Sequence, residues 1–128
     1  MHRISRIIVG LVATTAAGVG VFAGAAPASA ADETIAGCDY PRVCFYKTFN
    51  DYERERPTAA YRDLGPTQTL GSRSKGASVV VNTRNDDGAL LHFTNGRTTC
   101  LQPNGELLAT EYGVVDKITI MNSPICRK

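Results

Sequence analysis

The four cysteines of this 128-residue chain, Cys38, Cys44, Cys100 and Cys126, constrain its fold more than any other feature. An even number of cysteines in a short exported protein predicts disulfides, and four cysteines can pair in three ways. Pro41 favours a turn between Cys38 and Cys44, so a local bridge is the best-supported pairing and leaves Cys100 with Cys126. Because they lower the conformational entropy of the unfolded chain, these bridges would add about 2–2.5 and about 3.5 kcal/mol to the free energy of unfolding. Both are large against a typical stability of roughly 5–15 kcal/mol.

A zinc site is the alternative use of these cysteines. Neither C-x-x-C nor a Cys and His pair at zinc-finger spacing occurs. His92 is the only histidine beyond residue 30. The sequence therefore predicts oxidised cysteines, no metal site and no cofactor.

Residues 1–30 have the features of a cleavable signal peptide. Arg3 and Arg6 form a positive head, residues 7–26 carry no charge, and Ala28 and Ala30 occupy the A-x-A positions that a signal peptidase recognises. The uncharged stretch approaches the length of a bilayer span, so a membrane anchor is the alternative. Its many small residues and the Ala-Ser-Ala sequence favour cleavage. We therefore expect a secreted protein without membrane attachment after cleavage.

Cleavage also changes the charge. The whole chain has 14 basic and 12 acidic residues, and the loss of Arg3 and Arg6 leaves 12 of each. Nucleic-acid binders usually carry a net basic patch. In this chain Arg54 and Arg56 alternate with Glu53 and Glu55, which is typical of a mixed, solvated surface. We do not expect a nucleic-acid partner.

The chain beyond the signal peptide is long enough for one domain. We expect a flexible leader at residues 31–37 and the domain at residues 38–128. Six segments have the β-branched, aromatic and apolar residues typical of strands. They are Val43–Lys47, Ala77–Asn82, Ala89–Phe93, Thr98–Gln102, Gly105–Ala109 and Lys117–Met121. The region from Asn50 to Arg62 has room for one helical turn before Pro57 interrupts it.

Turn sequences rich in Asn, Asp and Gly separate several of these segments, as hairpins require. Strands about ten residues apart predict an all-β sandwich or small barrel, stabilised by disulfides. A weak internal duplication is also visible, because Ala77–Asn82 and Lys117–Asn122 are both apolar runs that end in asparagine.

The order of these segments resembles a known family. Cys38 and Cys44 are separated by five residues and followed by Phe45 and Tyr46, and the strand Ala77–Asn82 comes later. In these motifs the chain is similar to the secreted actinobacterial peptidase-inhibitor family with a βγ-crystallin-like fold, which includes metalloproteinase inhibitors of Streptomyces. The likeness covers about Cys38 to Asn122. It implies a β-sandwich of two Greek-key motifs, in which Cys38 pins the N-terminus to the first strand.

The resemblance also bears on calcium, which crystallin domains bind through paired Asn or Asp residues. The corresponding places hold Arg73 and Ser74 in the first half of this chain, and Val115 and Asp116 in the second. Calcium needs several oxygen ligands with net negative charge. We therefore expect no tight calcium binding.

An enzyme is one functional class to consider. Nucleophilic catalysis requires a nucleophile, a base and an orienting group within reach. His92 alternates with apolar residues, which is typical of a solvent-facing strand residue, and Asp86 and Asp87 lie in a predicted turn. Paired acids for glycoside hydrolysis face one another across a cleft. The sequence therefore favours a protein that is not an enzyme.

A secreted inhibitor of extracellular peptidases is the function that the resemblance implies. Such a protein presents a rigid, substrate-like loop, so that little entropy is lost on docking. Thr99, Cys100 and Leu101, with Gln102, resemble the reactive segment of the family's metalloprotease inhibitors. In that role Leu101 would fill an apolar pocket of the protease and the Cys100 carbonyl would face the catalytic zinc of the target. The partner would be an extracellular protease, and we expect a monomer.

Two other segments are alternative exposed loops, Thr67–Leu70 and Asn85–Gly88. The alternative for Thr98–Gln102 is an ordinary strand with a core cysteine and a core leucine. The alternative function is a non-inhibitory module, whether a binding, structural or toxin-like secreted protein, which needs no reactive loop.

Overall fold

The computed structural model describes residues 33–127. The signal peptide expected at residues 1–30 and the first two residues of the expected leader lie outside them. The elements follow in the order β1 (Val43–Tyr46), α1 (Phe49–Glu53), β2 (Ala59–Tyr61), β3 (Gln68–Thr69), β4 (Val79–Asn82), β5 (Ala89–Phe93), β6 (Thr98–Leu101), β7 (Glu106–Leu108), the 3-10 turn η2 (Ala109–Glu111) and β8 (Val115–Ile120). Within residues 33–127, no helix is long and apolar enough to cross a membrane.

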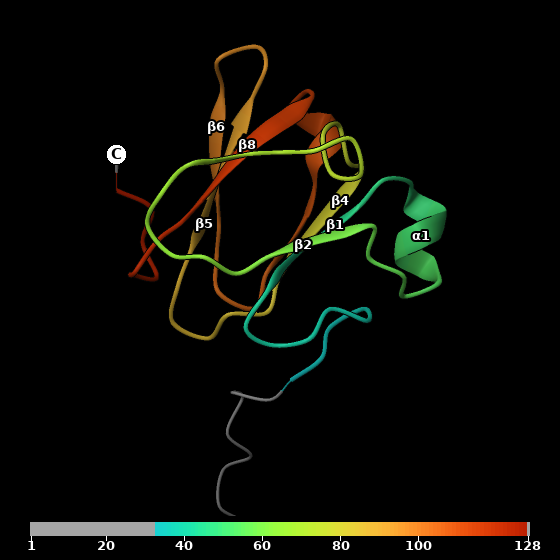
Figure 1. The fold of residues 1–128 in the computed structure, drawn as a ribbon, viewed down its shortest axis with the longest axis horizontal. Coiled ribbons are helices and arrows are strands. Elements are labelled where there is room, and N and C mark those ends of the chain that lie inside the picture. Colours follow the sequence, from blue (N-terminus) through green and yellow to red (C-terminus); the bar gives the residue numbers. More distant parts are fainter. Residues whose placement is uncertain (1–32, 128) are drawn as a thin grey trace, which may run out of the picture.

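The strands form two four-stranded sheets (Figure 1). Sheet one has the order β2-β1-β4-β7, and sheet two has the order β3-β8-β5-β6. Every pair of named neighbouring strands is antiparallel. Written from the other edge, the order of sheet two is β6-β5-β8-β3. Its first three strands then occupy the same positions as β2, β1 and β4 in sheet one. The remaining strand of each sheet, β7 or β3, comes from the opposite half of the chain.

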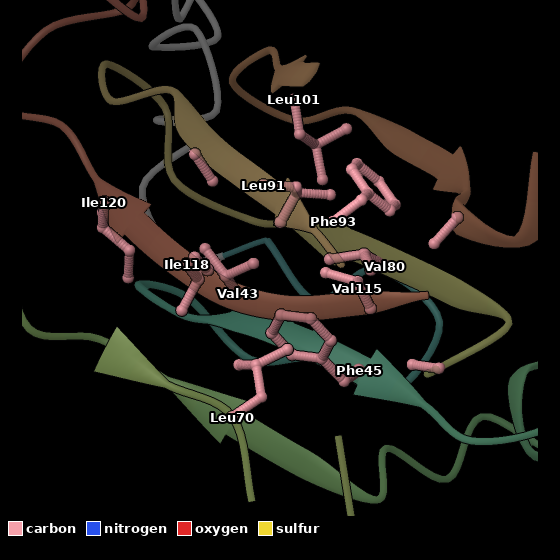
Figure 2. Packing of buried hydrophobic residues seen from close by; sticks show 13 residues of the cluster. Val43, Phe45, Leu70, Val80, Leu91, Phe93, Leu101, Val115, Ile118 and Ile120 are labelled. Carbon is pink, nitrogen blue, oxygen red and sulfur yellow. The ribbon is translucent and has the colours of Figure 1, made fainter. Parts of the chain in front are cut away.

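The core lies between the two sheets, and its residues follow from the alternation of side chains along each strand. Val43 and Phe45 of β1 and Val80 of β4 point inward and are buried in one cluster with residues of sheet two. In Figure 2 their side chains meet Leu91 and Ile118 between the ribbons. The all-β class expected from the sequence is therefore confirmed.

Each sheet carries one disulfide on its outer face. Cys44 alternates with the inward Val43 and Phe45, and it is bonded to Cys38. Cys100 stands next to the inward Leu101 and is bonded to Cys126. The first bridge fixes the segment before β1 and the second fixes the segment after β8. The pairing expected from the sequence is confirmed, and none of the four cysteines is free.

Helix α1 packs beside the outer face of sheet one. Thr48 caps its N-terminus by accepting a hydrogen bond from the Asp51 amide, and the Asp51 carboxylate in turn accepts one from the Thr48 amide. This reciprocal capping fixes where the helix begins. The chain then leaves the helix through Glu55, which has a positive φ of 54°. The helical turn expected before Pro57 is present.

All six predicted strands are present, each shifted by no more than two residues at either end. The segments compared as a duplication lie in β4 and β8, which occupy matching positions in the two sheets. Two strands were not predicted, β2 and β3. Both are short edge strands at one end of a sheet.

The expected flexible leader needs a correction over Ile35, Ala36 and Gly37. Ile35 and Cys38 exchange two main-chain hydrogen bonds of 3.1 and 2.8 Å, and the Tyr46 hydroxyl donates to the Ala36 carbonyl at 2.5 Å. Ile35 and Ala36 pack on the outer face of sheet one. The bridge at Cys38 holds this turn against the sheet, so these three residues belong to the domain.

Candidate functional site

The segment expected to be a reactive loop is strand β6. It pairs with β5 from Thr98, opposite His92, to Leu101, opposite Ala89. Leu101 is only 4% exposed and is part of the core. Moving a leucine from a core into a partner's pocket forfeits roughly 1.5–3 kcal/mol of burial before any contact is gained. The expectation that Leu101 enters a protease pocket is therefore corrected: Leu101 is a core residue.

The neighbours of Leu101 are also engaged within the domain. Thr99 pairs with Leu91, and Cys100 is held in its disulfide on the outer face. Gln102 is exposed, but its main-chain carbonyl accepts a 3.2 Å hydrogen bond from the Asn82 side-chain amide. The segment is extended as expected, yet the Leu101 and Cys100 side chains and the main chain of the segment are committed to the fold.

The two alternative loops differ from each other. In Thr67–Leu70, Gln68 and Thr69 form β3 and Leu70 is buried. In Asn85–Gly88, Asp87 is buried and bonded to Arg84, so only Asp86 of the two adjacent acids is exposed. Neither segment presents an exposed apolar side chain.

The C-terminal segment, Ser123–Arg127, presents an exposed apolar side chain. Ile125 is 57% exposed, more than any other large hydrophobic side chain in the described part of the chain. The next residue, Cys126, is bonded to β6 through Cys100. The Gly88 amide donates to the Ser123 carbonyl at 2.7 Å, which fixes the segment at its other end.

Gly88 lets the C-terminal segment approach the sheet. A Cβ atom at Gly88 would lie 3.0 Å from the Pro124 carbonyl oxygen, 3.1 Å from the Cys126 sulfur and 3.3 Å from the Cys100 sulfur. The absence of a side chain is therefore what allows the disulfide and Pro124 to pack here. Sequence reasoning missed this segment, although an apolar residue between Pro124 and Cys126 is a visible signal.

A second apolar feature lies between α1 and β7. This cavity, the β7 groove, has a volume of about 270 Å³ and is lined by Phe49, Tyr52, Val79, Glu106, Leu107 and Leu108. Phe49 and Leu108 are 50% and 44% exposed. The groove therefore opens to solvent with apolar side chains on both walls. Sequence reasoning missed it because its two walls are more than 50 residues apart in the chain.

One polar pair crosses the β7 groove. The Tyr52 hydroxyl donates a 2.6 Å hydrogen bond to Glu106 Oε2, and this bond raises the pKa of Tyr52. Beneath it the Tyr46 ring packs edge-on against Tyr52 with centroids 5.4 Å apart. Burial is the main reason why the pKa of Tyr46 is raised, and the nearby Tyr52, Glu106 and Glu55 add to it.

A larger and more polar cavity of about 490 Å³ lies at the opposite edge of the sandwich. It is lined by Arg42, Ala60, Tyr61, Arg62, Asp63 and Gln68. Its charges are of both signs and are exposed. This agrees with the mixed, solvated surface expected from the alternation of basic and acidic residues.

Three of the residues considered for catalysis or metal binding, His92, Ser74 and Val115, contact other residues of the domain. His92 lies half-buried on the outer face of sheet two, with Nε2 3.0 Å from Thr119 Oγ1. Of the places compared with a calcium site, Ser74 is buried and bonded to the Tyr61 hydroxyl at 2.7 Å, and Val115 is in the core. Among residues 33–127, no three His, Cys, Asp or Glu side chains come together as a possible metal site.

In comparisons with known proteins, no family model, no curated protein and no solved structure matches this chain.

Proposed function

We propose that the protein is a secreted inhibitor of extracellular peptidases, and that it binds its target through the C-terminal segment. The observation that carries this proposal is Ile125, an apolar side chain 57% exposed and placed directly before a disulfide-bonded cysteine. The protein would act as a tight-binding ligand of a peptidase, without a catalytic activity of its own.

The strand order supports the fold that this proposal assumes, a βγ-crystallin-like pair of Greek keys. Sheet one (β2-β1-β4-β7) and sheet two (β6-β5-β8-β3) repeat the same order, and each takes its last strand from the other half of the chain. Two interlocked four-stranded motifs would produce this arrangement. Such a sandwich holds its surface segments on a rigid frame, which lowers the entropy lost on docking.

The anchoring of the C-terminal segment supports its role. An inhibitor segment must keep one conformation when free, because ordering a flexible segment on binding costs affinity. Ser123 is fixed by Gly88 and Cys126 by Cys100, so Ile125 lies between two fixed points. An apolar side chain that projects from such a segment suits the specificity pocket of a peptidase.

The position of Pro124 favours one class of target. Its carbonyl oxygen packs against Gly88 and so faces this protein's own surface. The peptide bond between Pro124 and Ile125 is then unsuited to present its carbonyl to a catalytic zinc ion. Ile125 would instead precede the attacked bond, where serine peptidases with an apolar pocket select their substrates. We therefore expect a serine peptidase of this kind to be inhibited more strongly than a thermolysin-type metallopeptidase.

The test is a titration of the exported protein against one peptidase of each class. We expect stoichiometric loss of serine-peptidase activity, and weaker inhibition by the Ile125→Asp variant. Leu64→Asp is the matched control, because Leu64 is also exposed, at 40%, and lies outside the C-terminal segment. Equal inhibition by wild type and Ile125→Asp would rule out this segment. No inhibition of either class at micromolar protein would rule out the function.

A non-inhibitory binding module is the second candidate. The β7 groove favours it, because an open apolar cavity beside a strand edge is a surface that can bind a peptide without any peptidase. Such a module would bind through sheet one, whereas the proposed inhibitor binds through the segment on sheet two.

A further inference from the structure

The edge of sheet one at β7 has main-chain groups that can pair with another strand. The bonds from the Asn82 amide to the Gly105 carbonyl and from the Ala109 amide to the Ser78 carbonyl, both 2.9 Å, bracket β7. Hydrogen-bonded and non-bonded pairs alternate along an antiparallel ladder. The main-chain N–H and C=O groups of Leu107 therefore form hydrogen bonds with β4. Those of Glu106 and Leu108 point away from the sheet. Such a row of groups at a sheet edge is a template for pairing with another extended chain.

The side chains at this edge define what the extended chain should carry. Glu106 and Leu108 lie on the outer face of sheet one, opposite Val81 and Val79 of β4. Leu108 and Phe49 are the two exposed apolar walls of the β7 groove. A residue paired with Leu108 would place its side chain about 4.5–5.5 Å away at Cβ, so an aromatic ring there would extend the apolar surface that Leu108 and Phe49 form.

The charge at the other end of β7 points to a basic side chain. Glu106 is exposed, and the Tyr52 hydroxyl occupies only one of the sites at which its carboxylate can accept a hydrogen bond. No basic side chain in the described part of the chain forms an ion pair with it. Opposite charges in directly facing positions stabilise paired strands. A cation on the added strand would therefore complement Glu106.

We propose that the β7 groove binds an extended peptide as a fifth strand of sheet one, antiparallel to β7. Its aromatic residue would lie opposite Leu108, and a basic residue two positions later would lie opposite Glu106. A second copy of this chain fits less well, because pairing β7 with itself places Glu106 opposite Leu108 and brings no cation to either carboxylate. This site is separate from the C-terminal segment and does not depend on peptidase inhibition.

The test uses a synthetic peptide, acetyl-Thr-Phe-Thr-Arg-Thr-amide, titrated into ¹⁵N-labelled protein and followed by NMR. We expect saturable shifts of the Glu106 and Leu108 amide signals. The same peptide with glutamate in place of arginine should bind about fivefold more weakly, as facing like charges repel. The Glu106→Gln variant should bind both peptides equally.

Variants of the apolar wall complete the test. Leu108→Ser should bind the arginine peptide about fivefold more weakly through lost apolar contact, whereas the exposed control Leu64→Ser should bind it as wild type does. Three results would overturn the proposal: no shift at millimolar peptide, equal binding of both peptides by the wild type, or a dimer in sedimentation that Leu108→Ser abolishes. Because the readout is peptide binding, a failure here leaves the inhibition assay unaffected, and the reverse also holds.

Discussion

Arg84 and Asp87 form an ion pair inside the domain, with Nη2 of Arg84 2.7 Å and Nε 2.8 Å from Oδ2 of Asp87. Their side chains are only 10% and 7% exposed. Nη1 of Arg84 also donates to the carbonyl of Pro41 at 3.0 Å and to that of Arg62 at 3.4 Å. The pair therefore joins the turn after β4 to the segment before β1 and to the end of β2.

Removal of the carboxylate should be costly, because it leaves a buried guanidinium without its counter-charge. Asp87→Ala should lower the free energy of unfolding by about 3–5 kcal/mol in a urea titration. Asp86→Ala is the matched control, since Asp86 is the adjacent, exposed acid. It should change stability by less than about 0.5 kcal/mol. Similar losses in the two variants would contradict a structural role for the ion pair.

The close packing at Gly88 gives a second prediction. Gly88→Ala forces the Pro124 carbonyl and the second disulfide to move, so it should cost about 1–3 kcal/mol of stability. It should also weaken peptidase inhibition, because the C-terminal segment shifts. At Gly71 a Cβ would meet nothing within 4 Å, so Gly71→Ala should leave both properties unchanged. Thermal unfolding and the inhibition titration measure the two effects. A fully active Gly88→Ala variant would be the contrary result.

The two disulfides should differ in what they support. Replacing Cys100 and Cys126 by serine should cost about 3.5 kcal/mol and weaken inhibition at least tenfold, since Ile125 loses one of its fixed points. Replacing Cys38 and Cys44 should cost about 2–2.5 kcal/mol and leave inhibition by the folded protein intact. Both double variants are compared at a temperature where circular dichroism shows them folded. Inhibition that survives loss of the second bridge would argue against the C-terminal segment.

Stability should fall at alkaline pH because of Tyr46 and Tyr52. Their pKa values in the folded protein are raised above the ordinary value of 10.0, by burial for Tyr46 and by the Glu106 hydrogen bond for Tyr52. The unfolded chain therefore loses these protons first, and the stabilisation that is complete below about pH 10 is lost as pH rises further. Each group contributes at most about 1.4 kcal/mol per pH unit.

The variant Tyr46→Phe separates this effect from general loss of stability. It should be less stable at neutral pH, by about 1 kcal/mol for the lost bond to Ala36, but its stability should decline less steeply above pH 10. Thr34→Val removes a surface hydrogen bond to Asp39 and should keep the wild-type slope. Urea titrations between about pH 9 and pH 11 measure the slope. A stability that stays constant over this range would contradict the assignment.

The longer strands could be predicted because their residues carry a local signal. The run at Val79–Asn82 is β-branched, the run at Ala89–Phe93 is largely apolar, and both lie beside turn residues. Strand β3 has only Gln68 and Thr69, and no alternation can be seen in two residues. Its existence depends on pairing with Lys117 and Ile118 of β8, which is a contact between distant parts of the chain. Such a short strand can be recognised only when the structure of the whole sheet is known.

The candidate site was harder to predict for the same reason. The segment around Leu101 was recognised as extended, but a strand pattern does not say whether a leucine faces the core or the solvent. Its inward direction is set by the pairing with Ala89. Likewise, the position of Ile125 depends on the bond between Cys126 and Cys100 of β6, and Phe49 of α1 and Leu108 of β7 line one groove although they are far apart in the chain. Each of these depends on tertiary contacts.

The exchange of β3 and β7 between the halves has a consequence for cutting the chain. A fragment that ends after β4 would lack β7 from sheet one, and its β3 would have no sheet two to join. The fragment from β5 onward would lack β3 from sheet two, and its β7 would have no sheet one to join. Neither piece should fold by itself, whereas the two co-expressed pieces should reassemble into the native sandwich. A cut beside the exposed Asp86 would thus divide this protein into complementing parts, with Arg84 on one part and its ion-pair partner Asp87 on the other.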